Sequence, residues 1–108
     1  MIISKTNIQK IEAKLSTYIG FSIRSGQVLY GVDNISTCKK RIFLILVSGG
    51  LGDSSKDKIT KVATDRACPI YYLEDGLLAD FTHKEGVKAI AILDTSLAGA
   101  ISDCISSL

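Results

Sequence analysis

Hydrophobic residues recur at helical spacing near the start of the chain. Between Asn7 and Arg24 they follow one another mostly in steps of three and four, at Ile8, Ile11, Leu15, Tyr18, Ile19 and Ile23. Such steps place side chains on one face of a helix and predict a helix over residues 7–24. The glycine of Ser25-Gly26 suits the left-handed turn that commonly ends a helix. The segment from Gln27 to Tyr30 is then predicted to be extended.

A different pattern marks the strands, because there the apolar residues follow one another almost without polar interruption. The strongest of these runs is Ile42 to Val47, and the second is Val87 to Leu93, in which Lys88 is the one polar residue. A run without alternation is typical of a strand that is buried on both faces, and hence of a central strand in a covered sheet. After the single proline, Pro69, the segment Ile70 to Tyr72 predicts a shorter strand.

Helices are predicted between these strands. Their expected starts are Gly31, an N-cap at Ser54 with Asp57 three positions on, a cap at Asp75, and a cap at Asp94 or Thr95. Helices and strands thus alternate through 108 residues, a length that suits a single domain. The alternation predicts an α/β fold in which a sheet of about four strands lies between helical layers.

The amino-acid composition excludes few classes of function. The formal net charge of +2 permits nucleic-acid binding without demanding it. Cys38, Cys68 and Cys104 are odd in number and include no C-x-x-C pair, so buried thiols are expected rather than disulfides. The single histidine, His83, argues against metal binding and against an enzyme built on it. Neither catalytic residues nor a cofactor is predicted.

The sequence shows no targeting or membrane segment. Residues Met1 to Asn7 lack the long apolar core of a signal peptide. The longest apolar run, Ile42 to Val47, is far shorter than the about 20 residues that span a bilayer. We therefore expect a cytoplasmic protein with no membrane partner.

The segment Ser48 to Gly52 is a glycine-rich turn between the central strand and a helix. Glycine-rich turns in that position can hold phosphates through backbone N–H groups, and Lys56 and Lys58 follow closely. The spacing matches neither G-x-x-x-x-G-K-[ST] nor G-x-G-x-x-G. A small-molecule site or an enzyme at this turn is thus the weakest of three hypotheses.

The helix that begins at Gly31 carries polar groups on its first turn. Asp33 and Asn34 stand where N–H groups without intrahelical partners also lie, so this end can accept and donate hydrogen bonds to base edges and phosphates. The cluster Lys39-Lys40-Arg41 adds cations that either contact phosphates or complement the helix dipole.

At this segment the chain resembles a known family. Residues Ile19 to Gly31, IGFSIRSGQVLYG, are similar to the pattern LGLA-x-RAGK-[LV]-x-x-G of kink-turn-binding ribosomal proteins. Later landmarks agree in order and spacing, so that the resemblance covers about Ile11 to Ile105; they are Ile42 to Val47, Cys68-Pro69-Ile70 and Ala89 to Asp94. The resemblance implies a three-layer α-β-α sandwich with a mixed sheet, and binding to kinked, kink-turn-like or ribosomal RNA.

The resemblance also implies which residues bind RNA. In the family, the helix after the glycine carries G-[AT]-N-E-V-T-K, which touches guanines and neutralises phosphate. The residues implied here are Gly31, Asp33, Asn34, Thr37 and Lys40, with Leu73 as an apolar wall. The motif is altered. Asp33 stands where the family has Asn and is acceptor-only when ionised, whereas Asn34 stands where the family has Glu and gains two donors. Thr37 replaces the lysine. The resemblance implies a second RNA-facing segment, Leu73 to Thr82, where Glu74, Asp75 and Asp80 bring negative charge near phosphate.

Two hypotheses are therefore preferred to the hypothesis of a phosphate-binding site. The first is a non-catalytic RNA-binding module, associated with the ribosome or another ribonucleoprotein, and it predicts a positive surface at the start of the Gly31 helix. The second is a divergent relative that kept the fold, lost RNA and acts through a protein partner or as a homodimer.

Overall fold

Helices and strands alternate along the chain, as the periodicity predicts. The structure is a computed structural model that describes residues 2–108. The strands are β1 (Ile2–Ile3), β2 (Val28–Tyr30), β3 (Leu44–Ser48), β4 (Ile70–Leu73) and β5 (Ala89–Ile92). The helices are α1 (Lys5–Ile8), α2 (Glu12–Arg24), α3 (Val32–Ser36), α4 (Asp53–Asp65), α5 (Leu77–Thr82) and α6 (Thr95–Ser106).

One mixed sheet contains all five strands in the order β1-β4-β3-β5-β2. The pairs β1–β4 and β4–β3 are parallel, whereas β5 is antiparallel to both of its neighbours. As a result, β2, β3 and β4 all end at the same end of the sheet, where β5 begins. We call this the Gly31 end, because Gly31 follows β2 there.

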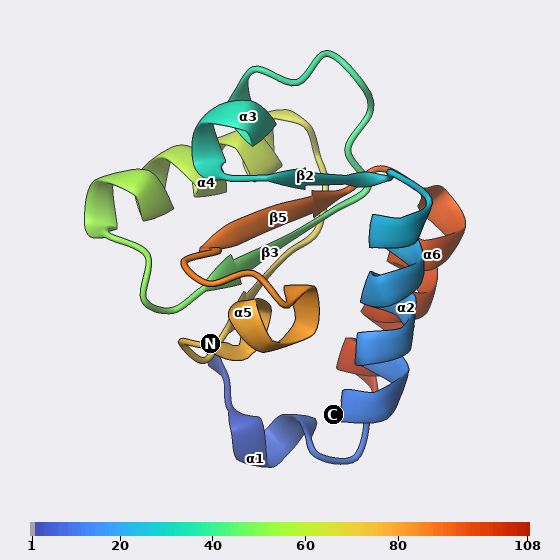
Figure 1. Cartoon of the computed structure of the whole chain (residues 1–108). Coiled ribbons are helices and arrows are strands. Elements are labelled where there is room, and N and C mark those ends of the chain that lie inside the picture. The colour runs from blue at the N-terminus through green and yellow to red at the C-terminus, as the bar shows by residue number, and fades with distance from the viewer. Residues whose placement is uncertain (1) are drawn as a thin grey trace.

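The sheet lies between two helical layers, which confirms the predicted α-β-α sandwich (Figure 1). One core cluster joins the sheet to α1, α2, α5 and α6, and the other joins it to α3 and α4. The central strand β3 is buried along its whole length, as its unbroken apolar run predicts. Strand β5 contributes Ile90 and Ile92 to the first cluster and Ala89 and Ala91 to the second.

The N-terminal segment differs from the prediction in two ways. Strand β1 was not expected, so the sheet has five strands rather than about four. The helix expected over residues 7–24 is interrupted between Ile8 and Glu12 and forms the separate helices α1 and α2. The interruption is a turn in which the Ile11 N–H donates to the Ile8 carbonyl at 3.0 Å, and Ile8, Ile11 and Leu15 all remain buried.

Two predicted helix caps are wrong and one is confirmed. Gly52, not Ser54, precedes α4, and no side chain in the described part of the chain caps that helix. Gly76, not Asp75, precedes α5, because the Asp75 carboxylate is engaged elsewhere. The Asp94 carboxylate accepts a hydrogen bond from the Leu97 N–H at 2.8 Å, as the cap prediction requires. The three cysteines are partly rather than fully buried, and all are free thiols.

Candidate functional site

The candidate site begins at Gly31, where the backbone passes from β2 into α3. Gly31 has φ 90° and ψ 148°, a region that L residues rarely adopt. Its N–H donates to the Ala89 carbonyl at 2.9 Å, and its carbonyl accepts from the Ile35 N–H at 3.1 Å. A Cβ at this position would meet no atom within 4 Å. The backbone angle, and not a lack of space, therefore requires glycine here.

Asp33 is exposed on the first turn of α3 and forms an ion pair. Its Oδ1 lies 2.8 Å from Nζ of Lys58, which comes from the neighbouring helix α4. The hydrogen bond and the charge of Lys58 lower the pKa of Asp33 below its usual value. Asp33 is thus ionised near neutral pH, and its second carboxylate oxygen remains an open acceptor next to a cation.

Asn34 and Thr37 make hydrogen bonds to the backbone of their own segment. The Asn34 Nδ2 donates to the Tyr30 carbonyl at 2.9 Å, and the Thr37 Oγ1 donates to the Asp33 carbonyl at 2.9 Å. The Asn34 side chain is exposed and keeps one N–H and its carbonyl oxygen for a ligand. Thr37 lies at the C-terminal end of α3. Of the predicted residues, Gly31, Asp33 and Asn34 lie together at its start.

The structure separates Lys40 from these residues. Gly31 bonds to Ala89 at the start of β5, whereas the N–H of Phe43 donates to the carbonyl of Ile92 at its end, at 3.0 Å. Lys40 is exposed in the loop just before Phe43, and the Arg66 guanidinium holds this loop through the Lys40 carbonyl. Lys40 therefore belongs to the opposite end of the sheet from Gly31.

Leu73 does not form the expected apolar wall. Its side chain is 1% exposed and packs in the core cluster shared by α1, α2, α5 and α6. As the last residue of β4 it points into this layer, so a ligand at the surface cannot reach it. Leu51 and Val87 provide apolar surface at the Gly31 end instead, as they are only partly buried.

A shallow groove of about 260 Å³ runs along the Gly31 end of the sheet. Gly31 and Val32 form one side of it, and Leu51, Val87 and Lys88 come from the neighbouring turns. The groove brings the β2–α3, β3–α4 and α5–β5 turns together. Sequence reasoning missed this grouping, although strands that end at the same side of a sheet could have indicated it.

The glycine-rich turn after β3 is closed by hydrogen bonds. The N–H groups of Gly49, Gly50 and Leu51 donate to the Leu73 carbonyl, the Ser48 Oγ and the Ser48 carbonyl, at 2.7, 3.1 and 3.1 Å. A phosphate would need these donors, and they are already used. The phosphate-binding hypothesis for this turn is therefore not supported by its geometry.

Asp75 links this closed turn to the start of β5. Its Oδ1 accepts a hydrogen bond from the buried Ser48 Oγ at 3.0 Å and lies 2.9 Å from Nζ of Lys88. The Lys88 and Ser48 contacts lower the pKa of Asp75. A Cβ at Gly50 would lie 2.5 Å from the same carboxylate oxygen, so only glycine at this position leaves room for the Asp75 side chain.

The charge at the Gly31 end is mixed rather than uniformly positive. Lys58 and Lys88 are paired with Asp33 and Asp75. Lys84 is exposed, with its Nζ 4.1 Å from the centroid of the Tyr30 ring, and Glu85 lines the groove. None of these pairings was predicted, because they depend on contacts between residues 13 to 54 positions apart in sequence.

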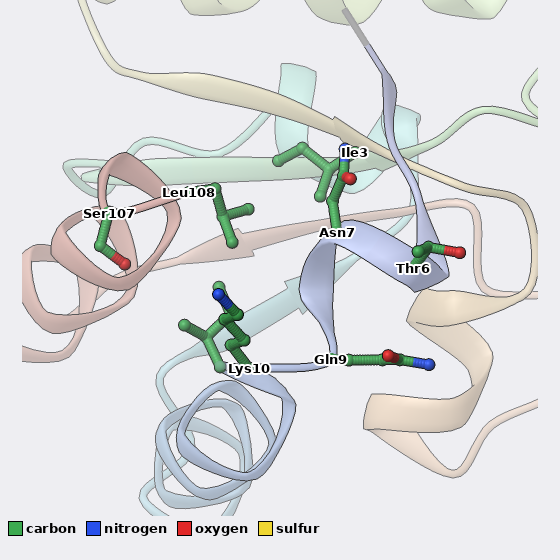
Figure 2. Close-up of a pocket in the computed structure, with 8 residues that line it drawn as sticks. Ile3, Thr6, Asn7, Gln9, Lys10, Ser107 and Leu108 are labelled. Atoms are coloured by element: carbon green, nitrogen blue, oxygen red, sulfur yellow. The ribbon is translucent and has the colours of Figure 1, made fainter.

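The largest cavity described lies away from this site. It has a volume of about 560 Å³ and lies where α1 meets the end of α6 (Figure 2). Ile3, Asn7 and Lys10 come from the N-terminal segment, and Leu108 faces them from the C-terminal one. Among the described residues of its lining, only Lys10 has an ionisable side chain, so these residues do not assemble acid–base groups.

Residues 2–108 contain neither a cluster of metal ligands nor a membrane-spanning helix. No group of three or more His, Cys, Asp or Glu side chains there could hold a metal ion. Among the described helices, none is both long and apolar enough to cross a membrane.

Comparison with known proteins identifies the fold class. No protein-family model and no curated protein sequence matches the chain. Among solved structures, the chain is similar to a protein of unknown function from Bacillus halodurans, with a TM-score of 0.74 and 19% identity. The similarity covers 87% of this chain and 98% of the other. At this identity it shows a shared fold, so function has to be argued from the site.

Proposed function

We propose that the chain is a non-catalytic RNA-binding protein of the kink-turn-binding ribosomal type, and that it works in a cytoplasmic ribonucleoprotein. The observation that carries the proposal is the open turn at Gly31. Its motif is part of the family resemblance, and its polar first turn adjoins a groove at the end of the sheet. Within residues 2–108, no side chain caps α3.

The chemistry of this turn suits the edges of unpaired bases. Asp33 offers carboxylate oxygens to N–H donors such as those of guanine, and Asn34 offers both a donor and an acceptor. Lys58 compensates the charge of Asp33, which lowers the repulsion between this carboxylate and nearby phosphates. Proteins that recognise irregular RNA read such splayed bases together with the shape of the backbone.

The test is a titration with a kink-turn RNA and with a matched duplex from which the bulge has been removed. We expect tighter binding to the kink-turn RNA, with an affinity that falls as salt rises. The double substitution Asp33→Ala and Asn34→Ala should weaken it by on the order of tenfold or more, since hydrogen bonds involving charged groups contribute about 1.5–3 kcal/mol.

The control for this variant is the double substitution Asp53→Ala and Ser54→Ala. These exposed residues occupy the first turn of α4 at the same end of the sheet. The control should bind the kink-turn RNA like wild type. A folded wild-type protein that does not distinguish the two RNAs would contradict the proposal.

One observation favours a second candidate function. Asp33 and Asp75 already neutralise Lys58 and Lys88, so the Gly31 end lacks the uniform positive surface expected of an RNA site. The alternative is a protein-interaction module that acts through a protein partner or a homodimer. Sedimentation equilibrium tests the homodimer: a dimer that the Asp33–Asn34 variant disrupts supports it, and a monomer over a wide concentration range contradicts it.

A further inference from the structure

A second groove lies between α2 and α5, outside the site described above. Its volume is about 390 Å³, and its lining includes Ser16, Thr17, Gly20, Arg24, Phe81 and His83. Hydroxyl, guanidinium and imidazole groups share this lining, and it contains no carboxylate. The groove is thus both polar and free of negative side chains.

Arg24 is held in a defined place beside this groove. Its guanidinium carbon lies 4.8 Å from the centroid of the Phe21 ring, a cation–π arrangement. Its Nη1 lies 3.6 Å from where a Cβ of Gly20 would stand, so the guanidinium lies close along α2. Within residues 2–108, no acidic side chain forms an ion pair with Arg24. Its charge is therefore available to an anionic ligand.

The C-terminal end of α5 connects the groove along the chain to the Gly31 end. His83 lines the groove, and the next residue, Lys84, places its Nζ 4.1 Å from the centroid of the Tyr30 ring. Tyr30 directly precedes Gly31, so Lys84 lies between His83 of the groove and the candidate site, whereas Arg24 lies just before the start of β2, toward the other end of the sheet. Gly31 is the seventh residue after Arg24, so their Cα atoms lie at most about 25 Å apart.

We propose that the α2–α5 groove binds the phosphodiester backbone of the same RNA strand whose bases are read at Gly31. This inference rests on the proposed function. Arg24 supplies a planar guanidinium that fits phosphate oxygens, and Ser16 and His83 supply hydrogen-bond donors beside it. Lys84 on the Tyr30 ring bridges the two contacts. The groove thereby adds affinity and fixes orientation, while the Gly31 turn reads the bases.

The substitution Arg24→Gln tests the groove, because it keeps the length of the side chain and removes the charge. We expect affinity for the kink-turn RNA to fall by on the order of tenfold at low salt. The slope of log affinity against log salt should decrease by about 0.7 to 1, the effect of losing one phosphate contact. A structural role alone would not change this slope.

Two further variants complete the experiment. Lys14→Gln removes an exposed cation from the same helix outside the groove lining, and it should leave the affinity and the slope nearly unchanged. His83→Asn retains a residue type that tolerates the left-handed backbone, φ 57°, and should weaken binding less than Arg24→Gln does.

The outcomes separate this inference from the proposed function. If wild type binds the kink-turn RNA and Arg24→Gln behaves like Lys14→Gln, the groove makes no contact and the inference is wrong while the proposed function stands. If Arg24→Gln alone lowers both affinity and salt slope, the inference is supported. A folded wild type that binds neither RNA overturns both.

Discussion

Two turns at the Gly31 end of the sheet lead from a strand into a helix, and they do so in opposite ways. The β3–α4 turn is closed, since Ser48 and Asp75 help to satisfy its backbone groups internally. The β2–α3 turn is open, because Gly31 has a φ of 90° and the polar side chains of Asp33 and Asn34 that follow it are exposed. The comparison teaches that glycine content alone does not identify a ligand-binding turn. The two turns differ instead in how many of their donors and acceptors are left without a partner among the described residues.

The largest expected effect comes from Gly31→Ala, which forces an L residue to adopt φ 90°. We expect a loss of about 1–3 kcal/mol in the free energy of unfolding, because such backbone conformations are strained for residues with a Cβ. Urea denaturation measures this loss, and the RNA titration should show weaker binding in the same variant.

Gly52→Ala is the matched control. Gly52 also precedes a helix and also has no atom within 4 Å of a Cβ, but its φ is −63°. Its stability should stay within about 0.5 kcal/mol of wild type, since alanine restricts the unfolded chain but is a weaker N-cap than glycine. Equal losses in the two variants would show that the sign of φ is not what matters at Gly31.

The next effect comes from Ser48→Ala, which breaks the closed turn. The hydroxyl of Ser48 donates to Asp75 and accepts from the Gly50 N–H, and the residue is 1% exposed. We expect a loss of about 1–2 kcal/mol in urea denaturation, because a partly buried N–H then lacks its partner. Ser54→Ala, on the exposed surface of α4, should change stability by less than about 0.5 kcal/mol.

A smaller effect is expected from acid. The folded state lowers the pKa of Asp75 through Lys88 and Ser48, and that of Asp33 through Lys58. A lowered pKa stabilises the folded protein above the unfolded-state pKa, near 3.8, and this contribution disappears as pH falls through the lower folded-state pKa. Denaturation midpoints measured from about pH 5 down to pH 2 should therefore decline.

The variant Asp75→Asn separates the contribution of Asp75 from general acid unfolding. It should flatten part of this decline, and added salt should do the same because both carboxylates are exposed. An identical pH profile in Asp75→Asn and wild type would contradict a role for Asp75.

The smallest effect on stability is expected from Lys58→Gln, which removes the partner of Asp33. Both side chains are mostly exposed, so the free energy of unfolding should change by at most about 0.5 kcal/mol. Its effect on RNA affinity should be larger, because the Asp33 carboxylate would then face phosphates without compensation. A change in stability without a change in affinity would place Asp33 outside the interface.

The sequence predicted the elements wherever the hydrophobic pattern was long enough. β3 and β5 followed from unbroken apolar runs, and α6 from its spacing and the Asp94 cap. β1 could not be recognised, because a pattern of two residues has no periodicity. The break before α2 was also hidden, since the buried spacing of Ile8, Ile11 and Leu15 continues through the turn.

The candidate site was only partly predictable for a related reason. Gly31, Asp33 and Asn34 are neighbours in sequence and stay together in the structure. Lys58 and Lys88 join the site through tertiary contacts, which local patterns do not encode. Leu73 and Lys40 were placed wrongly, because a linear motif does not reveal which face a strand residue occupies or to which end of the sheet a loop returns.

The order of the strands also constrains how the chain can fold during synthesis. The two edge strands of the sheet, β1 and β2, both come from the first thirty residues. β1 pairs with β4, and β2 pairs with β5. Neither can find its partner until residues 70–73 or 89–92 have left the ribosome. Because pairings between residues far apart in sequence form slowly, we expect α2 and β3 to remain without stable tertiary packing in a loosely collapsed chain until then. β1 can pair once β4 is available, and β5 completes the sheet by joining β3 to β2.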